Sequence, residues 1–225
     1  MIIRPKGQKA SNAMKKIVLQ DQEISESSSQ KILGVKVRND LSWSTHIQDV
    51  RKKVNYGLYI LKRMKSNLCQ KSLRALGEGL VMSHIRYCIP LFLSDKARIS
   101  EGDPVNQELQ GIQTLQNKML RIILGVSLRD KIPTKTLLQK VNMLSINQMV
   151  CMSTLMETWS ALNLGVDSIS CHFKRMKSLR FSEQLQGTKD PKSFVSCAAR
   201  LYNMTNDGIK MTNLTKKLDK KQEAS

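Results

Sequence analysis

Alternating apolar and polar residues near the N-terminus predict short β-strands at residues 1–4, 16–20 and 31–37. The Asn39-Asp40 pair follows the third segment and predicts a turn, because short polar side chains hydrogen-bond their own backbone. Isolated strands leave backbone groups unpaired, so these segments would need a sheet to join. The first 40 residues are therefore the β portion of the predicted fold.

From residue 41 onward, apolar residues recur at helical spacing. The pattern predicts helices at 42–67, 70–87, 105–124, 135–141 and 146–163. Thr134 and Ser145 have the side-chain oxygens that N-caps require. Pro90 is expected to end the second helix and Gly125 the third, since proline cannot continue a helix and glycine favours its C-terminal stop. The fold class predicted is mainly α with a small β portion (α+β).

The apolar residues of each predicted helix define a face that we expect to be buried. In the first helix these residues are Ile47, Val50, Val54, Leu58, Leu61 and Met64. In the third they are Leu109, Ile112, Leu115, Met119, Ile122 and Ile123. In the last they are Ile146, Met149, Met152, Met156 and Trp159. Methionine fills irregular gaps, so the twelve methionines of the chain favour an adaptable core over a cofactor site.

Breaks in these patterns divide the chain. A polar stretch with Gly102-Asp103-Pro104 predicts a linker, and the helical periodicity fades beyond residue 165. The predicted segments are 1–40, 41–93, 94–104, 105–165 and 166–225, of which the last is expected to be a basic, poorly ordered tail.

The charge balance indicates the kind of partner. The chain has 37 Lys and Arg against 18 Asp and Glu, a net charge of +19. Such an excess predicts binding to a polyanion, with nucleic acid favoured over an anionic membrane. No apolar run has the roughly 20 residues of a membrane span, and the N-terminus lacks the apolar core of a signal peptide. We therefore expect an intracellular protein, nuclear or cytoplasmic, with no membrane partner.

Cysteine usage argues against disulfides and metals. The five cysteines are an odd number without C-x-x-C spacing, and Cys171-His172 is adjacent rather than ligand-spaced. We expect reduced thiols, no metal and no cofactor. No Ser/His/Asp, Cys/His or paired-carboxylate arrangement indicates a catalytic residue.

The first predicted helix has a basic surface opposite its apolar one. This surface, the basic face, comprises Arg51, Lys52, Tyr56, Tyr59, Lys62 and Arg63. Between residues 42 and 74 there are eight basic residues and one acidic residue, Asp49. Cations that neutralise phosphates, interleaved with aromatic rings that lie on sugars or bases, suit a nucleic acid. A solvated helix face is the alternative.

The segment from Leu33 to Lys53 resembles a known protein family. It resembles the end of the palm and the start of the thumb in reverse transcriptases of non-LTR (LINE, jockey-like) retrotransposons. The matching positions are Leu33, Gly34, Val35, Leu41, Trp43, His46, Ile47, Val50 and Lys53, whereas Ile32 stands where the family has an aromatic residue. Residues 73–92, 115–125 and 193–210 resemble later segments of the same proteins.

The resemblance implies a role for each segment. Residues 1–40 would be remnant palm strands with a primer-grip-like Leu33-Gly34, 41–93 the thumb and 105–165 a helical connector. An ordinary hairpin glycine is the alternative for Gly34. The family's Asp-Asp metal-binding loop has no counterpart, since the chain contains no Asp-Asp pair. The chain is thus expected to begin after the catalytic centre and to be no enzyme by itself, although the parent activity is RNA-directed DNA polymerisation.

The expected function is to hold template–primer nucleic acid without catalysis. RNA, DNA or an RNA–DNA duplex would be bound without sequence preference, and the missing upstream polymerase domain is a further candidate partner. Two alternatives stay open. One is a free-standing basic helical nucleic-acid-binding protein derived from a retroelement, and the other is a decayed element copy with no selected function.

Overall fold

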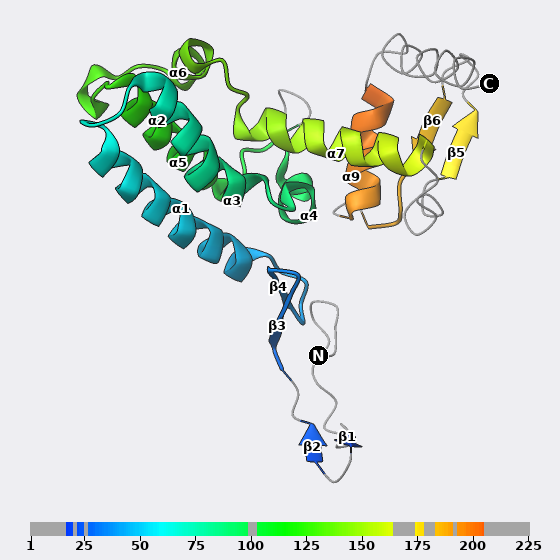
Figure 1. The fold of residues 1–225 in the computed structure, drawn as a ribbon. Helices are drawn as coiled ribbons and strands as arrows, with labels where there is room; N and C mark the ends of the chain where they lie inside the picture. The colour runs from blue at the N-terminus through cyan, green and yellow to red at the C-terminus, as the bar shows by residue number, and fades with distance from the viewer. Residues whose placement is uncertain are drawn as a thin grey trace, which may run out of the picture. The chain divides into compact units, whose positions relative to one another are not determined.

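The computed structural model describes residues 17–19, 22–24, 27–98, 103–163, 174–177, 183–190 and 193–204. This part of the chain is mainly helical with small antiparallel sheets, which confirms the predicted fold class (Figure 1). The chain separates into two compact units. Unit 1 comprises Met1–Cys88 and Leu115–Lys131, and unit 2 comprises Ile89–Thr114 and Ile132–Ser225. These cuts differ from the predicted segment boundaries, one of them falling inside a helix.

The described strands of unit 1 form two hairpins. β1 (Ile17–Leu19) pairs with β2 (Gln22–Ile24), and β3 (Ser29–Ile32) pairs with β4 (Val35–Arg38), both antiparallel. The strand predicted at residues 16–20 is present as β1, whereas that at 1–4 lies outside the described residues.

The prediction of one strand over residues 31–37 is wrong, because a two-residue turn interrupts it. Leu33 and Gly34 have φ angles of 47° and 85°, the left-handed pair that a type I′ hairpin turn requires. Leucine rarely adopts this conformation, so the apolar run favoured a continuous strand. The alternative of a hairpin glycine at Gly34 is the one that the structure shows. The turn predicted at Asn39-Asp40 is present.

Helices supply the rest of unit 1. They are α1 (Ser44–Met64), α2 (Gln70–Gly77), a π-helical segment (Glu78–Met82), α3 (Ser83–Arg86), the second half of α5 (Gln107–Leu124) and a 3-10 turn (Leu128–Asp130). α5 ends at Gly125, whose φ of 71° confirms the predicted stop. Of its predicted face, Ile122 is only half-buried, and Leu120 is buried instead.

The second predicted helix is present as a run from residue 70 to 86, but Pro90 does not end it. The run ends at Tyr87, and Cys88 follows with a φ of 54°. Pro90 is instead the second residue of α4 (Ile89–Leu93). A proline in the first turn of a helix removes no helical hydrogen bond, which explains why it is tolerated there.

The core of unit 1 is built on the apolar face of α1. Ile47, Val50, Val54, Leu58 and Leu61 are buried as predicted, whereas Met64, at the end of the helix, is exposed. Gly57 allows α1 to lie directly on the π-helical segment. A Cβ atom at Gly57 would be 2.5 Å from the carbonyl oxygen of Leu80. This distance is too short for a non-bonded contact between carbon and oxygen. The backbone of α1 at Gly57 therefore packs directly against the backbone of the π-helical segment at Leu80.

Unit 2 contains the remaining elements. They are α4, a 3-10 turn (Ser94–Lys96), the first half of α5, α6 (Thr134–Val141), α7 (Ile146–Asn163), β5 (Lys174–Lys177), β6 (Glu183–Gln186) and α9 (Phe194–Met204). Residues 94–98, within the predicted linker, are packed on α7. The backbone of Arg98 exchanges two hydrogen bonds of 2.8 Å with the side chain of Asn147.

The predicted caps of unit 2 have mixed outcomes. Ser145 caps α7 as predicted: its hydroxyl accepts from the Gln148 backbone N–H at 3.2 Å, and the Gln148 side chain accepts from the Ser145 backbone. Thr134 is not a cap but the first residue of α6, and the residue before it is Pro133.

The predicted apolar face of α7 is wrong in its middle. Ile146 and Met149 are buried, but Met152 and Met156 are 52% and 60% exposed. Val150, Thr154, Thr158 and Ala161 are buried in their place. The helix has a single charged residue, Glu157, so its sequence does not define which side faces solvent.

Part of the predicted tail is ordered. α9 packs on α7 and β6, and Cys197, Ala198, Ala199 and Leu201 of α9 are buried. The Asn203 side chain exchanges two hydrogen bonds with the backbone of Leu185 in β6. Small residues allow the close packing, and their weak apolar signal explains why a tail was predicted. Within the described residues, no helix is both long and apolar enough to cross a membrane.

Candidate nucleic-acid interface

The structure places all six residues of the basic face on the exposed side of α1. The buried residues of α1 recur every three or four positions and point at α2, α3 and the π-helical segment. Of the basic face, four residues lie between them in sequence and two follow the last of them, and all six are exposed: Arg51, Lys52, Tyr56, Tyr59, Lys62 and Arg63. Because α1 packs so closely on the Leu80 backbone at Gly57, the helix cannot rotate, and the orientation of its exposed side is fixed.

The cations of the basic face lack carboxylate partners. Among the described residues, none of Arg51, Lys52, Lys62 and Arg63 forms an ion pair. Asp49, the one acidic residue of this region, instead contacts Lys36 of β4 at 2.7 Å. The hydrogen bond from Lys36 is the main cause that lowers the pKa of Asp49, so this carboxylate stays charged and paired with Lys36. Asp49 also interacts electrostatically with Lys52 without forming an ion pair with it, so it offsets part of the positive charge of α1 at the Lys52 end.

Two neighbouring basic residues differ from those of α1. Arg74 of α2 contacts Glu78 at 3.2 Å, and Arg86 of α3 contacts the same carboxylate at 3.6 Å. Arg74 is one of the eight cations counted between residues 42 and 74, and its charge is balanced within unit 1. Glu78 is shared by the two arginines and offsets one of their two charges, whereas no cation of the basic face forms an ion pair with a described residue.

Sequence reasoning missed a contact inside the basic face. The Arg63 guanidinium donates a hydrogen bond of 2.9 Å to the Tyr59 hydroxyl, and its central carbon lies 5.5 Å from the centre of the ring. Residues four apart on a helix are neighbours, so the spacing could have indicated this pair. The contact restrains two long exposed side chains in one arrangement.

The primer-grip-like residues form the tip of the β3–β4 hairpin. The Leu33 side chain is 86% exposed, and its backbone carbonyl accepts a hydrogen bond of 2.5 Å from the Tyr87 hydroxyl. Gly34 lies beneath the same ring, since a Cβ atom there would be 3.6 Å from it. No sequence pattern signalled this contact. The structure explains Gly34 by its hairpin turn, and the resemblance to a primer grip stays a prediction.

The base of this hairpin is held by α1. The Lys36 backbone N–H donates to Nδ1 of the buried His46 at 3.4 Å, and burial lowers the pKa of His46. The turn that joins β4 to α1 is fixed by Asp40, whose carboxylate accepts from the Ser42 backbone N–H and hydroxyl. These bonds, with Arg38 nearby, hold the pKa of Asp40 at about 2. The hairpin and the basic face thus belong to one packed body.

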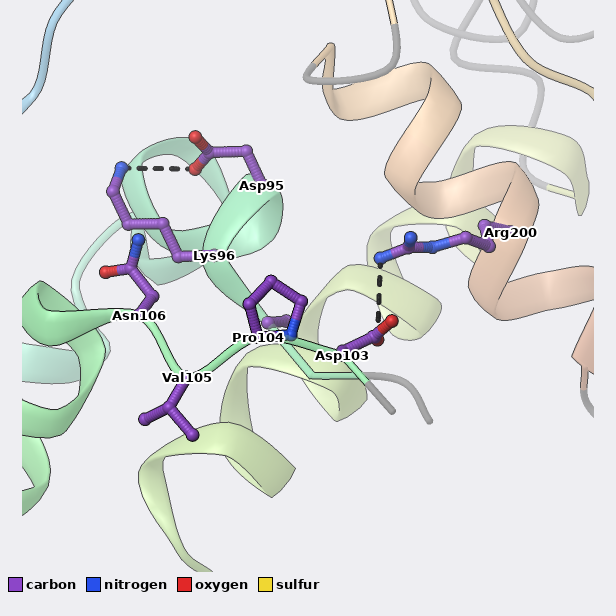
Figure 2. A pocket seen from close by; sticks show the side chains of 8 residues that line it. Asp95, Lys96, Asp103, Pro104, Val105, Asn106 and Arg200 are labelled. Atoms are coloured by element: carbon purple, nitrogen blue, oxygen red, sulfur yellow. Dashed lines mark hydrogen bonds and ion pairs between the residues drawn. The ribbon is translucent and has the colours of Figure 1, made fainter. Parts of the chain in front are cut away.

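Unit 2 has one polar pocket of note, with a volume of about 230 Å³ (Figure 2). Lys96 contacts Asp95 at 3.1 Å and Glu108 at 3.4 Å, and Arg200 lies 3.9 Å from Asp103. Its cations are already balanced by carboxylates, so it offers little to an anionic ligand. Within the described ranges, no group of three or more His, Cys, Asp or Glu could hold a metal ion.

The cysteines that the structure describes are free thiols, as predicted. Burial raises the pKa of Cys151 and Cys197, whereas the hydroxyl of Ser72 lowers that of the exposed Cys69. Cys171 lies outside the described residues. These thiols come from separate elements and do not form a site.

No protein-family model, curated protein or solved structure matches this chain. The resemblance to reverse transcriptases of non-LTR retrotransposons therefore stays a prediction from the sequence motifs. The functional argument rests on the geometry and charge of α1.

Proposed function

We propose that this chain holds nucleic acid on the basic face of α1, without reading sequence and without chemistry. The single observation that carries the proposal is a row of exposed cations on one ordered helix with no ion-pair partner among the described residues. Such cations bind phosphates and release counterions, which is the main source of sequence-independent affinity. The net charge of +19 strengthens the long-range attraction.

The resemblance adds the kind of nucleic acid. As the thumb of a non-LTR reverse transcriptase, the chain would hold a template–primer, an RNA–DNA duplex with its unpaired template. The absence of an Asp-Asp pair in the sequence supports a non-catalytic role for this chain. The same surface would serve a free-standing nucleic-acid-binding protein derived from such an element.

The test replaces two cations of the basic face and compares the variant with matched controls. Lys52→Glu with Arg63→Glu removes both ends of the face. Lys135→Glu with Lys140→Glu makes the same change at opposite ends of α6, where the effects on the helix dipole oppose each other. Lys217→Glu with Lys220→Glu does so in the C-terminal segment. Each pair lowers the net charge by four, from +19 to +15.

Affinity for a labelled oligonucleotide is measured by fluorescence anisotropy, with circular dichroism to confirm folding. We expect about a tenfold loss or more for the α1 pair and about twofold for each control. For the unmodified chain, neutralising about five phosphates predicts a slope of log K against log salt of about −3 to −5. Equal losses for all three pairs, or a slope near zero, would refute the proposal.

A further inference from the structure

The two tyrosines of the basic face are both exposed. The chain has four tyrosines, and Tyr87 is tied to the hairpin by its hydroxyl while Tyr202 is half-buried in α9. Tyr56 is 68% exposed and makes no hydrogen bond or ring contact with any described residue. Its ring therefore has no structural partner that explains it.

Tyr59 is exposed but held in place. It is 56% exposed, and Arg63 fixes it through both the hydroxyl hydrogen bond and the contact with the ring. A ring restrained in this way loses little conformational freedom when a flat ligand stacks on it. The guanidinium beside it remains a donor for a phosphate, since it has further N–H groups.

The four side chains form an ordered series along α1. Lys52 lies one turn before Tyr56, Tyr59 follows on the same side of the helix, and Arg63 lies one turn beyond. The rings are neighbours because residues three apart have Cβ atoms about 5–6 Å from each other. At the rise of an α-helix, Lys52 and Arg63 are roughly 16 Å apart along its axis. The order is cation, ring, ring, cation.

We propose that this surface prefers unpaired nucleotides, with bases stacked on Tyr56 and Tyr59 and the adjoining phosphates on Lys52 and Arg63. This inference rests on the proposed function and specifies its ligand. In a duplex each base face is covered by the next base pair, so a flat ring on a helix surface has nothing to stack on. Unpaired bases expose that face, and stacking on aromatic side chains is how proteins bind single strands without reading sequence.

Charge alone would give the opposite preference. A duplex has the higher density of phosphates, and each contact releases more counterions from it than from a single strand. A preference for single strands would therefore have to come from the rings. Charge and ring stacking thus favour different ligands, so comparing a duplex with a single strand distinguishes between them.

The experiment compares a single-stranded oligonucleotide with a blunt duplex of the same length at one salt concentration, by fluorescence anisotropy. The variant Tyr56→Leu with Tyr59→Leu removes the rings but keeps apolar side chains, the net charge and good helix formers. We expect it to weaken binding of the single strand about tenfold and binding of the duplex less than about twofold. Tyr56→Phe with Tyr59→Phe keeps the rings and should retain the wild-type preference for the single strand.

The outcomes separate this inference from the proposed function. If the leucine variant weakens binding of both ligands equally, or of neither, while Lys52→Glu with Arg63→Glu still weakens binding about tenfold or more, the stacking inference is wrong and the interface stands. If the phenylalanine variant loses the single strand as the leucine variant does, the hydroxyls and not the rings are responsible, and the inference is again wrong. If the wild-type chain binds neither ligand, the proposed function fails as well.

Discussion

Among the residues that the structure describes, α1 and α7 are the two long helices that lie within single units. Their sequences determine their surfaces to different degrees. In α1, the buried positions are apolar or small apart from His46, and the exposed face has the cations and tyrosines. In α7, threonines are buried while Met152 and Met156 face solvent. Each helix has one buried side and one exposed side in the structure, yet only α1 could be oriented from its sequence.

The difference lies in charge. Burying an unpaired charge is so costly that every lysine or arginine of α1 marks the solvent side of the helix. α7 has only Glu157 to do this, and methionine, threonine, serine and alanine are tolerated on either side. Charged residues thus set the orientation of a helix more firmly than apolar residues do.

The comparison of α1 with α7 predicts the largest loss of unfolding free energy for a substitution of one buried leucine of α1. Leu61→Ala in α1 should cost about 3 kcal/mol of unfolding free energy, because Leu61 is fully buried and a cavity would remain. Met156→Ala in α7 should cost less than about 0.5 kcal/mol, since this side chain is exposed. Urea unfolding measures both.

Tryptophan fluorescence can separate the units in that measurement. The two tryptophans of the chain are Trp43, at the start of α1, and Trp159, in α7. Replacing one of them by phenylalanine in each background lets the other report on its own unit. A cost at Met156 as large as that at Leu61 would contradict the exposed position of this methionine.

The close packing of α1 on the π-helical segment provides a second test, with an expected change in unfolding free energy of about 2 kcal/mol. Gly57→Ala should destabilise unit 1 by about that amount, because the new methyl group would collide with the Leu80 backbone. Gly79→Ala is the matched control, since nothing lies within 4 Å of its added Cβ atom. It should stabilise the unit by about 0.5 kcal/mol, because alanine has less backbone freedom to lose. Equal effects would show that α1 is not packed so closely.

The smallest effect concerns the threonines of α7. The buried Thr154 hydroxyl has no hydrogen-bond partner among the described residues, so Thr154→Val should stabilise unit 2 by about 1 kcal/mol. Thr158→Val is the control, because its hydroxyl donates to the Thr154 carbonyl at 2.7 Å and would lose that bond. Valine and threonine are both β-branched, so helix propensity changes little. A destabilising Thr154→Val would contradict the lack of a partner.

Helical periodicity predicted which side of α1 is exposed. The six residues of the basic face are exposed because apolar residues every three or four positions leave the opposite side to solvent. Their neighbours were harder to predict. The ion pair of Lys36 with Asp49 and the contact of Tyr87 with Leu33 join residues far apart in sequence, and no local pattern contains them. The function of the face stays a prediction.

Local backbone features were the other source of error. Leu33 in a left-handed conformation contradicts the propensity of leucine, and the structure tolerates it where Tyr87 holds the Leu33 carbonyl. Helical spacing predicted a helix over residues 70–87, and its Gly77 and Gly79 are weak points because glycine has a low helix propensity. The form of that weak point, a π-helical segment, depends on tertiary packing against α1.

The π-helical segment also sets the rotational phase of the residues that follow it. A π turn accommodates an extra residue, and one residue of an α-helix corresponds to about 100° of rotation. Tyr87 is therefore directed to the side that its predecessor would occupy on an unbroken α-helix, and from there it reaches the hairpin tip. In any relative of this chain that lacks the extra residue, a different side chain would stand over the Leu33 carbonyl, and an ungapped alignment would be out of step from that point.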